Sequence, residues 1–309
     1  MELVKNFKVE KILNQDQVAH SIALLGTCPQ NSRARDSKED ASTNQIQSIL
    51  ILKKTAFSQD TVSQIGWDRL ETIQSNDIYH VLLGWLHSSR VDADVKIDLI
   101  SPATETHIRK YSQQKLKIVK ETPELYQSIV KPYITSFSPE RTSWVDNILS
   151  YKSEAEKILY EDDDWVIIPD FKWNLQDVNT LYLQAITRRR DVKSLRDIRP
   201  SHLAMLRQVR RQAYLIVKRW GIEQGGLRLY VHYQPSYYHF HVHIVQVNYT
   251  GFSGTSVGQA HLLDDIISLL EVDSDRSPSI FERMTLTYTL GQLHGLYDSM
   301  TSADIQEEV

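Results

Sequence analysis

The sequence has a single cysteine, no long apolar run and no strong excess of either charge. Cys28 is the one cysteine among 309 residues, which excludes an intrachain disulfide and fits a reducing compartment. No apolar stretch approaches the roughly 20 residues that cross a bilayer, and the N-terminal residues lack the apolar run of a signal peptide. The net charge is −4, so we expect no broad basic surface and no binding of long nucleic acid.

The order of polar and apolar segments predicts two α+β domains. Hydrophobic residues make up 41% of the chain and charged residues 24%, as is usual for a globular protein of one large or two modest domains. We place a smaller N-terminal domain at residues 1–115, a hinge at 116–123 and a larger C-terminal domain at 124–309. Residues 30–45 are almost wholly polar and are predicted to form a mobile loop.

Apolar periodicity predicts the elements of both domains. Strands are expected at residues 21–27, 46–52, 78–86, 94–101, 165–170, 181–186, 227–233, 239–245 and 284–290. Helices are expected at residues 60–73, from Thr104 to about 120, from Ser143 to about 160, at 200–220 with Pro200 in the first position, and at 261–271.

The chemistry of the protein is indicated by a row of alternating histidines. His239, His241 and His243 are separated by single apolar residues, so on a strand the three imidazoles share one face. Such a row is unusual on a strand that only packs, because those strands favour β-branched and aromatic residues.

The residues alone leave three interpretations of this row open. The histidines could be exposed surface residues. They could bind zinc, since imidazole is a common zinc ligand and an alternating strand can present several to one ion. They could also act on phosphorus, because a neutral imidazole can form a covalent bond to it while flanking imidazoles stabilise the developing charge.

A longer stretch around the row resembles a known family. Residues 232–243, His-Tyr-Gln-Pro-Ser-Tyr-Tyr-His-Phe-His-Val-His, are similar to the scavenger mRNA decapping enzymes, one branch of the histidine-triad superfamily. The alternating histidines point to the superfamily, and the preceding motif points to the branch. Further similar segments are residues 75–79, 102–107, 144–149, 168–173 and 194–197.

The resemblance implies an m7GpppX diphosphatase. Such an enzyme hydrolyses the m7GpppN cap, or short capped RNA, left after 3′-to-5′ mRNA decay, and it releases m7GMP and a nucleoside diphosphate through a phosphohistidine. It implies a C-terminal histidine-triad domain with an antiparallel sheet, preceded by a smaller domain that is exchanged between the subunits of a homodimer. No metal, cofactor or membrane partner is implied, and the location would be the cytoplasm, with the nucleus as a second compartment.

The resemblance also implies roles for individual residues. His241 would be the nucleophile, with His239, His243 and His232 beside the phosphates. The nucleophile needs a free Nε2, so its Nδ1–H should donate to a backbone carbonyl. Trp144 and Phe171 are expected on the two faces of the methylated base, and Glu154 on the guanine edge. The expected contacts to the ribose and phosphates come from Asp170, Lys172, Ser236 and Tyr237. Asn76 and His107 of the N-terminal domain are expected above the site.

One departure from the family keeps other functions open. Relatives often have an arginine before the Ala-His pair that follows the triad, where this chain has Gln259. Loss of a cation would weaken phosphate binding, and we expect a helix N-terminus near Gly258 to compensate in part. The chain could therefore be a catalytically weak or inactive cap-binding paralogue that regulates an active partner. A histidine-triad enzyme for dinucleoside polyphosphates or phosphoramidates is a further alternative, which Trp144 and Glu154 argue against.

Overall fold

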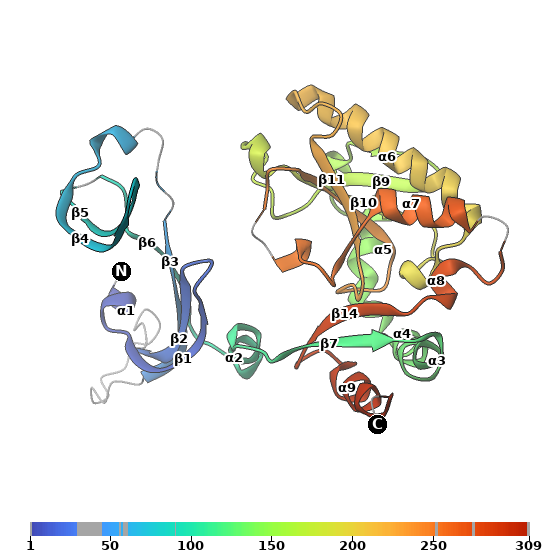
Figure 1. The fold of residues 1–309 in the computed structure, drawn as a ribbon. Helices are drawn as coiled ribbons and strands as arrows, with labels where there is room; N and C mark the ends of the chain where they lie inside the picture. Colours follow the sequence, from blue (N-terminus) through green and yellow to red (C-terminus); the bar gives the residue numbers. More distant parts are fainter. Residues whose placement is uncertain are drawn as a thin grey trace. The chain divides into compact units, whose positions relative to one another are not determined.

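The computed structural model describes residues 2–29, 45–55, 57, 61–89, 91–250, 253–273 and 276–307. The chain divides into two compact units, residues 1–113 and 114–309, and each is a mixture of strands and helices, which confirms the predicted α+β class (Figure 1). The loop predicted at 30–45 lies outside the described residues, apart from Gln45, which begins a strand. Among the described helices, none has both the length and the apolar character needed to span a membrane.

The first unit is built on a four-stranded antiparallel sheet in the order β1-β2-β3-β6. Its strands are β1 (Lys8–Asp16), β2 (Ser21–Pro29), β3 (Gln45–Lys54) and β6 (Val95–Ile100), and its helices are α1 (Glu2–Lys5) and α2 (Glu105–Tyr111). The apolar runs that predicted β2 and β3 bury Leu25 and Ile49 in a small core, which Ile108 of α2 completes. The strands expected at 21–27, 46–52 and 94–101 are confirmed.

A separate hairpin in the first unit replaces the helix predicted at residues 60–73. Only the 3₁₀ turn η1 (Val62–Gln64) is helical there, and it is followed by β4 (Trp67–Asn76), which pairs with β5 (Tyr79–Leu86). The prediction was wrong because it relied on the roughly helical spacing of four apolar residues and gave too little weight to the strand preference of the β-branched and aromatic residues in the same stretch. Asp77 has a positive φ of 51° in the tight turn that lets the two strands pair.

The second unit is built on a six-stranded antiparallel sheet in the order β13-β11-β12-β10-β9-β8. Its strands are β8 (Tyr160–Glu161), β9 (Trp165–Pro169), β10 (Tyr182–Thr187), β11 (Leu227–His232), β12 (His241–Gln246) and β13 (Ala260–Leu262). Helices α6 (Leu203–Val217) and α7 (Leu263–Val272) lie side by side and share one core with Val242 and Ile244 of β12 (Figure 1). The opposite face of β12 is thereby left for His241 and His243.

The rest of the second unit surrounds a two-stranded sheet of β7 (Leu116–Glu121) and β14 (Leu286–Gly291). The other helices are α3 (Pro123–Leu125), α4 (Lys131–Thr135), α5 (Ser143–Leu149), α8 (Ile280–Arg283) and α9 (Tyr297–Glu307). Shorter helical turns are η2 (Tyr126–Val130), η3 (Pro139–Thr142), η4 (Ala155–Lys157), η5 (Val178–Thr180), η6 (Leu195–Asp197), η7 (Pro200–His202), η8 (Lys218–Trp220) and η9 (Ser253–Thr255).

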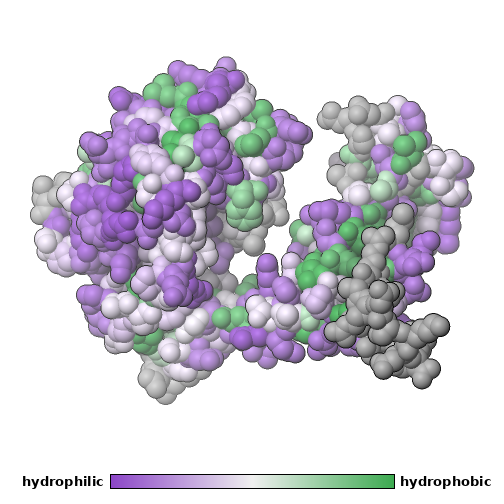
Figure 2. Space-filling model, turned by 180° about the vertical axis from the view of Figure 1, so that it is seen from behind, coloured by the Kyte–Doolittle hydropathy of each residue, from purple (hydrophilic) through white to green (hydrophobic). Residues whose placement is uncertain are grey.

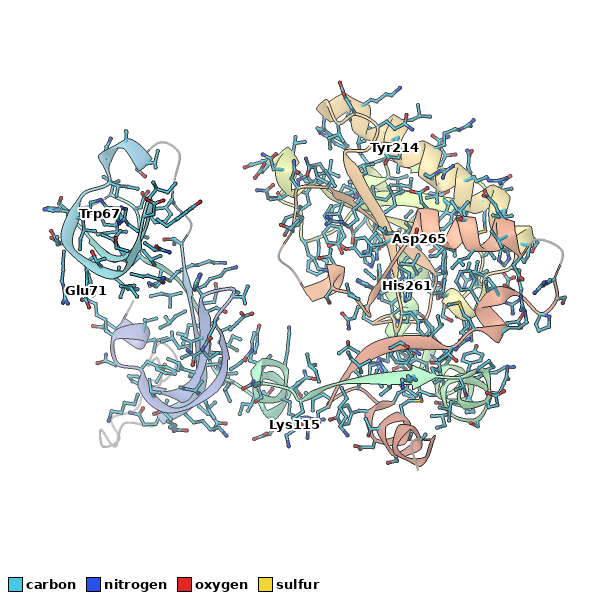
Figure 3. The ribbon with its side chains drawn as sticks, in the orientation of Figure 1. Trp67, Glu71, Lys115, Tyr214, His261 and Asp265 are labelled. Carbon is cyan, nitrogen blue, oxygen red and sulfur yellow. The ribbon has the colours of Figure 1, made fainter. Side chains whose placement is uncertain are left out.

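Two predicted helices are shorter than expected. The helix from Thr104 ends at Tyr111, and Lys115 then leads into β7, where Val119 and Glu121 turn inward in strand alternation (Figure 3). Residues 116–121 of the expected hinge therefore pair with β14 in the second unit. The helix from Ser143 ends at Leu149, since Tyr151 and Glu154 adopt positive φ angles of 59° and 57°, which an α-helix cannot contain.

Candidate active site

The predicted row of histidines lies at the centre of the large sheet. His241 begins β12 and His243 follows on the same face, with their ring centroids 4.9 Å apart. Val242 and Ile244 point the other way into the core and are fully buried. The predicted alternation of imidazole and apolar faces is confirmed from His241 onward.

His241 is held in the tautomer that a nucleophile requires. Its Nδ1 lies 2.7 Å from the carbonyl oxygen of His239, so Nδ1 donates a proton there and Nε2 keeps its lone pair. The predicted backbone carbonyl partner is therefore present. Burial of the ring lowers its pKa to about 3, which leaves the imidazole neutral at neutral pH.

Two further histidines complete a cluster around His241. The Nδ1 of His243 is 2.9 Å from the Tyr182 hydroxyl, and the Nε2 of His232, at the end of β11, is 2.7 Å from the Gly254 carbonyl oxygen. Burial lowers the pKa of both rings. Across the described residues, the buried Nε2 of His243 has no hydrogen-bond partner. Ring nitrogens of His232, His241 and His243 lie within 4.8 Å of one another, a set that also suits Zn²⁺.

His239 takes a different position from the one expected for a phosphate contact. Its Nε2 lies 2.6 Å from the carbonyl oxygen of Thr187, and burial lowers the pKa of the ring. The side chain does not line the cavity that contains the other histidines. The backbone of His239, through the carbonyl that orients His241, is the part that reaches the site.

A cavity of about 310 Å³ opens beside the histidine cluster. Ten of the residues expected at the site line it. They come from α5, the turn between α5 and η4, the loop after β9, the strands β11 and β12, and the segment that joins these two strands. The lining residues are Trp144, Ile148, Glu154, Ile168, Pro169, Asp170, Phe171, Lys172, Gln184, His232, Ser236, Tyr237, His241 and His243. The structure thus brings ten of the thirteen predicted site residues into one cavity, and His239, Asn76 and His107 are not among them.

One end of this cavity presents aromatic side chains. Trp144 on α5 is 37% exposed and Phe171 is 91% exposed, so both rings are free to contact a ligand. The Glu154 carboxylate lines the same end and is paired with Lys157 at 3.2 Å. An exposed aromatic pair with a nearby carboxylate suits a flat cationic base that also carries hydrogen-bond donors.

The cavity also carries a cation and a buried acid, from the two residues on either side of Phe171. The Nζ of Lys172 lies 4.9 Å from the ring centroid of Tyr182, whose hydroxyl contacts His243. The carboxylate of Asp170 accepts a hydrogen bond from the backbone N–H of Lys172 at 2.9 Å. Burial raises the pKa of Asp170 above its usual value.

Tyr237 links Trp144 to the nucleophile His241. Its ring stacks on His241 with centroids 4.3 Å apart and planes 12° apart, and it packs edge-on against Trp144 at 4.9 Å. Its hydroxyl accepts a hydrogen bond from the Nε2 of Gln184 at 2.6 Å, and burial raises the pKa of the phenol, which therefore stays neutral. Gln184 was missed from the sequence, where the only signal is an amide inside an otherwise apolar strand.

Comparison with known proteins gives two family matches and several relatives. Residues 2–114 match the N-terminal model of the scavenger mRNA decapping enzyme (DcpS), and residues 143–258 match the C-terminal binding model of the same enzyme. An m7GpppX diphosphatase of Schizosaccharomyces pombe is 36% identical over 98% of this chain and 96% of its own length. The chain belongs to the scavenger mRNA decapping enzyme family. The family expected from the histidine motif is thereby confirmed.

Other relatives of this decapping family also resemble most of the chain. The m7GpppX diphosphatases of Homo sapiens and Rattus norvegicus are each 38% identical to the chain, and the matches span 92% of it and 82% of their length. The two family matches correspond to the two units of the structure, so the two-domain architecture of the decapping family is confirmed.

Two residues that the family resemblance implicates belong to the first unit. Asn76 is the last residue of β4, and His107 lies in α2, where its Nδ1 accepts a hydrogen bond from the backbone N–H of Thr104 at 3.1 Å. Their expected contacts with a decapping substrate stay predictions.

The backbone around Gln259 does not form the helix N-terminus that was expected there. Ala260 and His261 belong to β13, and α7, which carries Asp265, begins only at Leu263 (Figure 3). Gly258 has a φ of +83° and lies in the turn before β13. The expected compensation by a helix N-terminus at Gly258 is therefore wrong, because the strand pairing of residues 260–262 with β11 delays the helix.

Proposed function

We propose that this chain is an m7GpppX diphosphatase that cleaves the cap dinucleotide or short capped RNA. The relatives that resemble it over most of its length carry that name. One observation carries the proposal, which is that Trp144 and a neutral, oriented His241 line the same cavity. The site therefore combines a surface for a cationic base with a nucleophile for phosphorus.

The aromatic end of the cavity would bind 7-methylguanine. Stacking of this cationic base on an indole contributes about 0.5–2 kcal/mol, and more where water is excluded. Phe171 would cover the second face of the base, and the Glu154 carboxylate would accept hydrogen bonds from its N1 and N2 edge. An unmethylated guanine lacks the positive charge and would bind more weakly.

The histidine end would carry out the chemistry in two steps. The Nε2 of His241 attacks the phosphorus that bears the methylguanosine, and the bond from that phosphorus to the bridging oxygen breaks. The nucleoside diphosphate leaves with the electron pair of that bond. The His239 carbonyl, which accepts the Nδ1–H, stabilises the positive charge on the imidazole. Water then attacks the phosphorus and releases m7GMP and neutral His241.

Neighbouring side chains would stabilise the phosphate charge. Lys172 supplies a cation on the cavity wall, and the unpartnered Nε2 of His243 is available to a phosphate oxygen. Ser236 lines the same wall and adds a hydroxyl. We place these groups around the transferred phosphate because the charge develops there.

A homodimer with exchanged N-terminal domains is part of the proposal. The β4–β5 hairpin exposes apolar side chains along both strands, among them Trp67 on β4, which Figure 3 labels, and Leu83 on β5. Apolar residues also reach the surface of this unit in the space-filling view (Figure 2). An isolated two-stranded hairpin is marginal in water, so these side chains call for a covering partner.

The first unit would also contribute to the substrate site and its closure. We assign Asn76 and His107 to contacts above the cavity, where a moving lid would exclude water during phosphoryl transfer. The proposed locations are the cytoplasm and, as a second compartment, the nucleus.

The proposal is tested by incubating the purified protein with m7GpppG. We expect m7GMP and GDP as products, weaker cleavage of GpppG, and retained activity in EDTA. The variant His241→Asn should lose more than about 10³-fold in kcat, because the nucleophile is gone, while its affinity for m7GMP stays near that of the wild type. Equal cleavage of GpppG would contradict the cap assignment, and an active His241→Asn would contradict the nucleophile.

A further inference from the structure

A buried carboxylate outside the cavity accepts hydrogen bonds from four residues, which belong to three parts of the second unit. Glu121, the last residue of β7, is fully buried, and its side chain forms an ion pair with the equally buried Arg196 at 2.7 Å. The hydroxyl of Tyr288 on β14 donates to Glu121 Oε2 at 2.7 Å. Two more donors come from the segment that follows β11. Tyr233 donates its hydroxyl at 2.7 Å, and Gln234 donates its Nε2 at 3.0 Å.

These last two donors belong to the segment that joins the two histidine strands. Residues 233–238 begin directly after His232 and end directly before His239. A hydrogen bond within the segment connects its two ends, because the Tyr238 hydroxyl donates to the Oε1 of Gln234 at 3.1 Å. Ser236 and Tyr237 lie between Gln234 and Tyr238 and line the cavity, and the Tyr237 ring stacks on His241.

We propose that Glu121 is a positioning residue that holds residues 233–238 so that His232 and Tyr237 meet His241 in reactive geometry. The expected effect on kinetics rests on the proposed decapping function. The expected effect on the structure of the segment rests on the contacts of Glu121 alone. The Arg196 guanidinium that pairs with Glu121 is itself held in place, since it also donates to the carbonyl oxygens of Phe281 and Met284 at 2.7 and 2.8 Å. A charged acceptor forms stronger hydrogen bonds than a neutral one, which suits an anchor.

The chain offers a matched pair of variants for the test. Tyr233 and Tyr288 are both fully buried, and each donates its hydroxyl to Glu121 at 2.7 Å. Tyr233→Phe and Tyr288→Phe therefore remove a hydroxyl from the same carboxylate. Tyr233 belongs to the segment at the site, whereas Tyr288 touches that segment through an edge-on ring contact with Tyr233 at 5.2 Å, which a phenylalanine retains. Both variants should lower the melting temperature to a similar extent, whereas a positioning role should separate them in the two measurements that follow.

The first measurement is hydrogen–deuterium exchange of the full chain. We expect Tyr233→Phe to speed amide exchange in peptides covering residues 233–241, and Tyr288→Phe to leave exchange there as in the wild type. This measurement does not depend on any catalytic activity, so it decides the positioning role even if the protein does not cleave m7GpppG. Equal exchange in the two variants would overturn the inference.

The second measurement is the hydrolysis of m7GpppG. We expect Tyr233→Phe to lower kcat by about tenfold or more with KM changed less than about twofold, because a small displacement of reacting groups costs rate rather than base stacking. Tyr288→Phe should keep kcat within about twofold of the wild type. Equal losses of kcat would reduce Glu121 to a purely structural role, whereas an inactive wild type would count against the proposed function alone.

Discussion

At the scale of single residues, Gln184 is the group in the site with the least expected position. Its amide fixes the Tyr237 hydroxyl at 2.6 Å, and that ring in turn stacks on the nucleophile His241. A residue in the middle of β10, two positions after Tyr182 and three before Thr187, would ordinarily be assigned to packing. Its contact with a tyrosine that lies 53 residues away gives it a place in the chemistry.

We predict that Gln184→Leu lowers kcat for m7GpppG about fivefold. The lost hydrogen bond is worth about 1 kcal/mol, and loss of that energy in the transition state corresponds to about that factor. Gln208→Leu is the matched control, because Gln208 also donates its Nε2 to a tyrosine hydroxyl, that of Tyr160 at 3.1 Å, and it does not line the cavity. Steady-state kinetics of both variants check this, and equal kcat values would contradict the role of Gln184.

The buried imidazole of His241 predicts a dependence of stability on pH. Burial lowers its pKa to about 3, whereas an unfolded histidine titrates at about 6.5. Below pH 6.5 the unfolded chain therefore binds a proton that the folded chain does not, and the free energy of unfolding falls as the pH drops from about 6.5 toward 3. Above about pH 6.5 both states are neutral and this contribution is constant.

His241→Asn should flatten that dependence. Removal of one such group takes up to about 1.4 kcal/mol per pH unit from the slope below pH 6.5. Denaturant unfolding followed by tryptophan fluorescence between pH 7 and 5 measures the slope for the wild type and the variant. Parallel curves would mean that the His241 ring is not held neutral by burial.

At the scale of elements, the β4–β5 hairpin is the least self-sufficient part of the described chain. Its ten-residue and eight-residue strands pair only with each other, and nearly every side chain on them is exposed. The helix prediction for the first of these strands failed because pairing with a strand further along the chain outweighed local spacing.

We predict that Leu83→Lys on β5 converts the proposed dimer to monomers. A charged side chain in a dry interface costs several kilocalories per mole, whereas on an exposed strand it costs almost nothing. Leu215→Lys on α6 is the control, since both leucines are 49% exposed and Leu215 lies in the second unit. Sedimentation analysis measures the mass of each variant in solution. A dimeric mass for Leu83→Lys would exclude the hairpin from the dimer interface.

At the scale of the whole molecule, the net charge and the volume of the cavity limit the size of the substrate. The net charge is −4, and the cavity of about 310 Å³ suits a nucleotide rather than a polymer. Binding of nucleic acid strands depends on phosphate contacts with lysine and arginine, and the net charge of −4 leads us to expect few such contacts outside the cavity.

We therefore predict little gain in binding from a longer RNA. Extension of m7GpppG by 20 nucleotides should lower KM less than about twofold, and the slope of log KM against log salt should change by less than about 1. Kinetics at several salt concentrations with the short and the long substrate test this. A KM that falls steeply with length, with strong salt dependence, would reveal a binding surface for RNA outside the cavity.

The sequence by itself determined the histidine strand, the family and most of the residues that line the cavity. Alternation over a few residues decides which face a strand side chain takes, so His241 and His243 could be assigned without knowledge of the remaining chain. The same local signals found β2, β3, β9 and β10. They misplaced the ends of the helices at 104–120 and 143–160, where strand pairing or a positive φ overrode periodicity.

Only the tertiary structure decided which distant groups meet. Three sets of contacts join residues that are 52 to 167 positions apart in the chain. They are the hydrogen bond between the His239 ring and Thr187, the hydrogen bond of Gln184 to Tyr237, and the hydrogen bonds of the tyrosines to Glu121. No pattern along the chain encodes such contacts, because they depend on how the strands and helices pack and on which buried polar atoms must find partners there.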